Sequence, residues 1–124
     1  MTTTPVIADC PDAVRAYMTL NESGDRTAAT ALFTDTAQVT DEGHDYRGTA
    51  EIRTWLDRAA NEYTYTTTPL AAENASDGRT SIRCRLEGNF PGGLVDVDFR
   101  FQLDAAGRLA RLSITPSAEQ PQAG

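Results

Sequence analysis

The sequence contains no lysine, a single histidine and only two cysteines, and these shortages exclude several classes of function. All 11 basic side chains are therefore arginines, and 18 acidic side chains outnumber them to give a net charge of -7. Binding to a phosphate backbone requires clustered basic side chains, so we expect no nucleic-acid partner. With one histidine and no cysteine cluster, we expect no dedicated metal site.

The chain also lacks a hydrophobic run of the length that a membrane span requires. Residues 1–9 contain no basic stretch followed by an apolar one, so we expect no secretion signal and a cytoplasmic location. Without such a signal, Cys10 and Cys84 are expected to remain free thiols rather than to pair. Cys84 is surrounded by apolar residues, which raise the pKa of a thiol, and this argues against a nucleophilic role.

A chain of 124 residues is long enough for one hydrophobic core and is expected to form one domain. We place this domain at residues 1–116. Residues 117–124 are rich in proline, glutamine, alanine and glycine and are predicted to be a disordered tail.

Three helices are predicted in the first half of the chain. The first begins near Pro11 and ends before Gly24, and the second is short and capped by Asp25. The third is capped by Thr49. Their apolar positions recur at helical spacing: Val14, Tyr17 and Leu20 in the first, Ala28, Leu32 and Phe33 in the second, and Ile52, Trp55, Leu56 and Ala59 in the third.

Beyond Asn61 the apolar residues alternate, which is typical of strands. Four strands are expected at residues 63–68, with Pro69 at an edge or at the strand's end, and at 80–90, 95–103 and 108–115. A short strand at 37–40, followed by the turn Asp41-Glu42-Gly43 and a possible return strand at 45–47, lies between the second and third helices. Three helices followed by antiparallel strands predict an α+β fold in which one sheet face packs under the helices.

Two of these strands are expected to carry charged residues on one face. If residues 80–90 and 95–103 pair as a hairpin with their apolar faces together, Arg83 and Arg85 lie on the same face as Asp96 and Asp98. This face is interpreted either as an exposed ladder of ion pairs or as a dimer interface.

A set of residues along the chain resembles the nuclear-transport-factor-like superfamily, which includes ketosteroid isomerase and the SnoaL-like polyketide cyclases. They are Gly24-Asp25, Ala31-Leu32-Phe33, Asp35, Ala37, Val39, Asp41-Glu42-Gly43, Gly48 and Ile52. The resemblance covers nearly the whole chain and implies a cone-shaped fold of three helices on a strongly curved antiparallel sheet. It also implies a homodimer and a small hydrophobic or carbonyl-containing ligand, with no cofactor.

In ketosteroid isomerase a tyrosine on the first helix donates to an oxyanion, and an aspartate after the first strand moves the proton. By this resemblance Tyr17 is the oxyanion donor and Asp41 the general base. A second, acidic donor of that enzyme corresponds to Phe99, so the resemblance does not extend to it. The neighbouring Asp98 has the opposite strand parity and is expected to point away from the site.

The aromatic residues Phe33, Trp55, Tyr63, Tyr65, Phe99 and Phe101 are candidates for lining a ligand pocket, and His44 is a candidate for a second titrating group. Simpler interpretations remain for each: a turn-forming Asp41, a core Tyr17, a polar turn at His44 and an ordinary aromatic core. Two functions are left open. One is a cofactor-independent isomerase or polyketide-cyclase-type enzyme, and the other is a non-catalytic ligand-binding or dimerisation module of the same fold.

Overall fold

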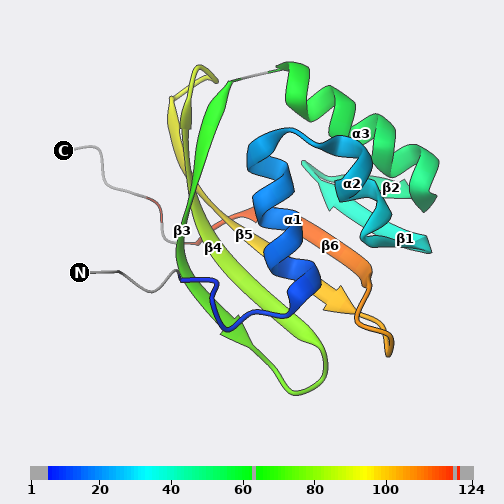
Figure 1. Cartoon of the computed structure of the whole chain (residues 1–124). Coiled ribbons are helices and arrows are strands. Elements are labelled where there is room, and N and C mark those ends of the chain that lie inside the picture. Colours follow the sequence, from blue (N-terminus) through cyan, green and yellow to red (C-terminus); the bar gives the residue numbers. More distant parts are fainter. Residues whose placement is uncertain (1–5, 63, 119, 121–124) are drawn as a thin grey trace.

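The computed structural model describes residues 6–62, 64–118 and 120. Three helices pack against one face of a six-stranded sheet that curves around the first helix (Figure 1). The helices are α1 (Asp12–Ser23), α2 (Arg26–Ala31) and α3 (Gly48–Glu62). The strands are β1 (Phe33–Asp41), β2 (His44–Arg47), β3 (Tyr65–Asn74), β4 (Arg79–Gly88), β5 (Leu94–Leu103) and β6 (Leu109–Pro116). The predicted α+β cone is confirmed.

The strand order is β2-β1-β6-β5-β4-β3, and the prediction of a wholly antiparallel sheet needs one correction. The β1 and β6 strands run parallel, with Val39 opposite Leu112 and Asp41 opposite Ile114. A parallel pair requires a long crossover, and here the connection passes through α3 and the meander of β3, β4 and β5. The sheet is therefore mixed, because β6 follows this meander and returns beside β1.

The helices begin and end close to the positions that the sequence indicates. The Asp25 carboxylate accepts a hydrogen bond from the Ala28 backbone N–H at 3.0 Å, which confirms this residue as the cap of α2. Gly24 ends α1 in the left-handed conformation, with φ of 82°. The prediction for Thr49 was wrong, because α3 already begins at Gly48.

The second helix is shorter than predicted. It ends at Ala31, and Phe33 is the first residue of β1 instead of part of the helix's apolar side. The reason is pairing with the last strand: the Leu109 N–H donates to the Leu32 carbonyl at 3.0 Å, and Phe33 lies opposite Leu109. These long-range contacts outweigh the local helical preference of the segment.

Between the helices and the sheet lies a core whose residues come from the predicted apolar stripes and strand faces. Both cysteines are buried and free, as expected. Burial raises the pKa of the Cys84 thiol to about 12, and the nearby Asp98 carboxylate adds to this shift. None of the helices within the described ranges is long and apolar enough to cross a lipid bilayer.

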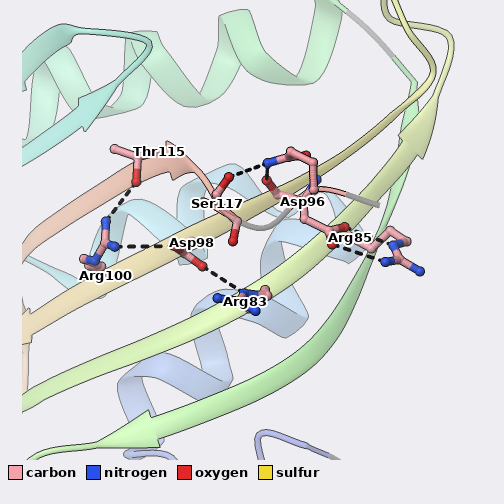
Figure 2. A network of polar contacts seen from close by, with 8 residues as sticks. Arg83, Arg85, Asp96, Asp98, Arg100, Thr115 and Ser117 are labelled. Atoms are coloured by element: carbon pink, nitrogen blue, oxygen red, sulfur yellow. Dashed lines mark hydrogen bonds and ion pairs between the residues drawn. The ribbon is translucent and has the colours of Figure 1, made fainter. Parts of the chain in front are cut away.

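The opposite face of the sheet carries the predicted charged residues (Figure 2). Arg83 lies opposite Asp98 and Arg85 opposite Asp96, which confirms that the four residues share one face. The Arg85 guanidinium contacts both Asp96 carboxylate oxygens, at 2.9 and 3.2 Å. Arg83 contacts one carboxylate oxygen of Asp98 at 3.5 Å, and Arg100 contacts the other at 3.4 Å.

Two residues of the segment predicted to be a disordered tail contact this face. The Ser117 N–H donates to the Asp96 carbonyl at 2.9 Å. The Gln120 side chain accepts from the Asp96 N–H at 2.9 Å and donates to its carbonyl at 2.8 Å. Residues 119 and 121–124 lie outside the described residues.

Candidate functional site

A cavity of about 990 Å³ opens between the helices and the inner face of the sheet. Its apolar wall consists of inward-facing residues from three adjacent strands, namely Leu86, Val95, Val97, Phe99 and Ile114. Tyr17 lines it from α1, Trp55 and Leu56 line it from α3, and Asp41 and Tyr46 line it from the β1–β2 hairpin. A volume of this size holds a small organic ligand.

Helical spacing positions Tyr17. It lies one turn after Val14 on the buried side of α1 and is only 1% exposed. Its ring packs at 6.0 Å against Phe33 and at 5.6 Å against Phe101, both edge-on. These contacts fix the ring while the residue still lines the cavity.

Strand alternation positions Asp41. Along β1 the inward-facing residues are Ala37 and Val39, both fully buried, and Asp41 is the next on that face. It is the last residue of the strand, so its half-buried carboxyl group reaches the cavity where the hairpin turns. The two turn residues, Glu42 and Gly43, both have positive φ, as in the two-residue hairpin turns that follow the twist of a sheet.

Trp55 holds the Asp41 carboxylate. Its indole Nε1–H donates to Asp41 Oδ2 at 2.9 Å, across the space between α3 and β1. The indole is 5% exposed and packs 6.2 Å from the Tyr46 ring, which lies on the same side of the hairpin as Val39. A charge-assisted hydrogen bond of this kind orients the carboxylate.

The Tyr17 hydroxyl stays protonated over the physiological range. Burial is the main reason that its pKa lies far above the ordinary value, and the hydroxyl of Tyr65 and the carboxylate of Asp41 raise this pKa further. A phenol that keeps its proton can donate a hydrogen bond to a ligand oxygen. The site therefore combines a proton acceptor and a hydrogen-bond donor in one largely apolar cavity.

The other predicted ligand contacts fall into four groups. Trp55 and Phe99 line the cavity, whereas Phe33 and Phe101 are core residues that support Tyr17 from behind. His44 is exposed at the start of β2 and does not line the cavity. Tyr63 lies outside the described residues.

Sequence reasoning missed several residues of the cavity wall. Tyr46 was one of them, although its pairing with Val39 in the predicted hairpin would have placed it on the inner face. Arg26 and Arg58 line the cavity from α2 and α3 and carried no recognisable signal. Asp98 was predicted to point away and does so, since it pairs with Arg83 and Arg100 on the opposite face.

No metal centre is apparent in the part of the chain that the structure describes, where no three His, Cys, Asp or Glu side chains come together. The polar groups that line the cavity are carboxylates, hydroxyls, two arginines and an indole, and His44 is not among them.

A family model and several solved structures match this chain. The family model of the SnoaL-like domain matches residues 14–112. A candidate polyketide cyclase of Sinorhizobium meliloti is 32% identical, with a TM-score of 0.81 over 86% of this chain and 96% of that one. Among curated proteins, no sequence matches this chain significantly.

Two further solved structures share the fold at lower identity. The epoxide hydrolase/cyclase-like enzyme SalBIII, which has a role in pyran ring formation in the polyether salinomycin, is 18% identical, with a TM-score of 0.74 over 86% of this chain and 89% of that one. A Mycobacterium tuberculosis protein in complex with estradiol-17β-hemisuccinate is 17% identical, with a TM-score of 0.72 over 86% of this chain and 92% of that one.

Proposed function

This chain belongs to the SnoaL-like domain family, and from that premise we propose that it is a cofactor-independent isomerase or cyclase acting beside a carbonyl group. The observation that carries the proposal is the Asp41 carboxylate, oriented by Trp55 Nε1 at 2.9 Å on the wall of a largely apolar cavity that Tyr17 also lines. The relationship to a candidate polyketide cyclase, at 32% identity, supports a cyclase activity.

In this mechanism Asp41 is the general base. It removes a proton from a carbon next to the ligand's carbonyl, and the electron pair of the broken C–H bond moves to the carbonyl oxygen. Tyr17 donates a hydrogen bond to the enolate oxygen that forms. Protonated Asp41 then returns the proton to another carbon in an isomerisation. In an aldol-type cyclisation the enolate carbon instead attacks a second carbonyl carbon, and the oxygen of that carbonyl takes the proton from Asp41.

The substrate class follows from the cavity wall. Leu86, Val95, Val97 and Phe99 offer an apolar surface, and Asp41 and Tyr17 add a carboxylate and a phenol to the same wall. Such a wall suits a small hydrophobic molecule with one carbonyl group directed at these two residues. The steroid derivative bound by the Mycobacterium tuberculosis relative is a ligand of this general kind.

Proton exchange tests the proposal without knowledge of the physiological substrate. β-Tetralone, a small aromatic ketone with acidic C–H groups, is incubated with the protein in D₂O, and loss of the α-proton signal is followed by NMR. We expect Asp41→Asn to lower the protein-catalysed exchange rate by about 10²–10⁴-fold, the range of general-base catalysis.

A matched control comes from the same hairpin. Asp45 is exposed on β2, where its carboxylate accepts from the Thr40 hydroxyl at 2.6 Å, and it does not line the cavity. Asp45→Asn makes the same chemical change and should leave the exchange rate as it is in the wild type. Full exchange in Asp41→Asn would refute the general-base role.

A ligand-binding protein without catalysis is the second candidate, and Phe99 favours it. This side chain is 4% exposed and presents a hydrocarbon surface to the cavity where the family resemblance would have an acidic donor. Binding of β-tetralone without accelerated exchange, in the wild type, would establish this alternative.

We also propose that the protein is a homodimer that pairs through the outer sheet face. The charges there compensate one another within the chain, in the Arg83–Asp98 and Arg85–Asp96 pairs, so the face carries little net charge to repel a second copy. Light scattering at micromolar concentration tests this. A mass of 13.4 kDa would show a monomer and contradict the proposal.

A further inference from the structure

Tyr65 is the first residue of β3, and the strand register directs it into the cavity. It lies directly opposite Gly88 in the antiparallel pair of β3 and β4. Gly88 continues the inward face of β4 that carries Ile82, Cys84 and Leu86, and residues directly opposite one another share a face. Tyr65 lines the cavity accordingly, on the edge strand across the sheet from Asp41.

The residues 88–90 form a support for Tyr65. A Cβ atom at Gly88 would lie 2.5 Å from the Tyr65 Cβ and closer still to the Thr64 carbonyl oxygen, so only glycine leaves room for the strand here. Asn89 holds Thr64 from both sides, since its N–H donates to the Thr64 carbonyl at 3.1 Å and its side chain accepts from the Thr64 N–H at 2.8 Å. Phe90 packs edge-on against the Tyr65 ring at 6.3 Å.

This support matters because Tyr65 is not enclosed on all sides. The residue is 36% exposed and lies on an edge strand, where packing alone would leave its orientation free. The glycine beside the Tyr65 Cβ, the edge-on Phe90 and the two hydrogen bonds to Thr64 together define its position.

The hydroxyl of Tyr65 belongs electrostatically to the same site as Tyr17 and Asp41. Burial raises its pKa above the ordinary value, and the Asp41 carboxylate raises it further. Among nearby ionisable groups, Tyr65 has the largest effect on the pKa of Tyr17. Both phenols therefore remain protonated and can donate hydrogen bonds into the cavity.

We propose that Tyr65 is a second hydrogen-bond donor to the ligand oxygen that Tyr17 binds, and that Gly88 is the positioning residue that makes this possible. The inference rests on the proposed function of the cavity. It gives the developing oxyanion two phenolic donors, one from α1 and one from β3, in a cavity where Phe99 contributes none.

An oxyanion mimic tests this separately from catalysis. Affinities for 4-nitrophenolate and for nitrobenzene, which lacks the oxygen anion, are measured by absorbance and calorimetry in the Asp41→Asn protein, where the carboxylate no longer repels an anion. In that background Tyr65→Phe should weaken 4-nitrophenolate binding by about 10-fold or more, the scale of one hydrogen bond to a charged group. Nitrobenzene binding should change less than about twofold, since the ring is retained.

Gly88→Ala provides the second variant, because it keeps the hydroxyl and displaces it. We expect a loss of 4-nitrophenolate affinity in the same direction, and no further loss when Gly88→Ala is combined with Tyr65→Phe. A Tyr65→Phe protein that binds 4-nitrophenolate as tightly as its parent would overturn the inference, as would an equal loss for both ligands or failure of the parent to bind 4-nitrophenolate.

The two proposals fail in distinguishable ways. If Asp41→Asn retains β-tetralone exchange, the catalytic proposal is wrong whatever the phenolate measurements show. If exchange depends on Asp41 while Tyr65→Phe leaves phenolate affinity unchanged, catalysis stands and Tyr65 is an ordinary wall residue.

Discussion

The Trp55 indole Nε1–H donates a hydrogen bond of 2.9 Å to the Asp41 carboxylate, joining the third helix to the end of the first strand inside the cavity. The bond orients the proposed base toward the space that Tyr17 faces. Because this tryptophan is the only one in the chain, the contact can also be followed by fluorescence.

The first prediction concerns this contact. Trp55→Phe keeps an aromatic ring in the cavity but removes the donor that aligns the carboxylate, so kcat for β-tetralone exchange should fall by about 10-fold or more, because a misplaced reacting group slows the chemical step. KM should change little, since the cavity wall is otherwise retained. A purely structural role of Trp55 would instead lower the thermal midpoint and leave kcat of the folded protein unchanged.

Tyr17→Phe should separate hydrogen bonding from packing. The ring contacts with Phe33 and Phe101 survive this change, so the thermal midpoint should stay close to that of the wild type. The exchange rate should fall by roughly 10²-fold, the effect of one lost oxyanion donor. An undiminished rate in a folded Tyr17→Phe protein would remove Tyr17 from the mechanism and leave Asp41 acting alone.

The positions of Tyr17 and Asp41 on one cavity illustrate what local sequence patterns can predict. Helical spacing from Val14 and strand alternation from Val39 each specify a direction, and both directions lead to the same space under the sheet. The shared face of Arg83 and Asp98 could be predicted for the same reason, since a shift of one residue would turn every side chain of a strand to the other face.

Contacts between distant segments could not be predicted in this way. Nothing in the pattern of β1 specifies that its neighbour is β6, about 75 residues later. This pairing ends α2 early and makes Phe33 a core residue of the strand. Which aromatic residues line the cavity and which belong to the core also depends on contacts between distant segments. Phe99 and Phe101 share a strand face, but only Phe99 lies beside the cavity.

Alkaline pH should destabilise the fold through buried groups that resist ionisation. Tyr17 ionises near its ordinary pKa of 10.0 in the unfolded chain but higher in the folded one, and the pKa of Cys84 rises from 9.0 to about 12. Above the unfolded pKa values the unfolded chain binds fewer protons than the folded one, so the free energy of unfolding must fall as pH rises.

Urea denaturation at several pH values tests this dependence. In Tyr17→Phe the decline above about pH 10 should be shallower than in the wild type, by up to about 1.4 kcal/mol per pH unit for one proton. Equal slopes in the two proteins would mean that Tyr17 ionises in the folded state, against the burial that surrounds it.

The thiols should be slow to react in the folded protein. Both are buried, and burial raises the pKa of Cys10 as well as that of Cys84. Because the thiolate is the reactive form, Ellman's reagent at about pH 8 should label neither thiol quickly in the native state and both rapidly in denaturant. Fast labelling that Cys84→Ala abolishes would show that the interior of the sheet opens readily.

The last prediction contrasts two aspartates on the outer face. The Asp96 side chain is 6% exposed and accepts two hydrogen bonds from Arg85, whereas that of Asp98 is 16% exposed, and its contacts with Arg83 and Arg100 are longer, at 3.5 and 3.4 Å. Asp96→Asn removes the charge from the shorter, more deeply buried pair and should cost about 2 kcal/mol of unfolding free energy, below the usual range for buried pairs because Arg85 can reach water. Asp98→Asn should cost less than about 1 kcal/mol, as for an exposed pair. Urea denaturation of both variants decides the matter, and equal losses would mean that burial does not set the strength of these ion pairs.

If the same face also pairs two copies of the chain, the loss of unfolding free energy in Asp98→Asn should grow with protein concentration. The reason is that the substitution also weakens the dimer, and the dimer contributes to stability only at concentrations where it forms.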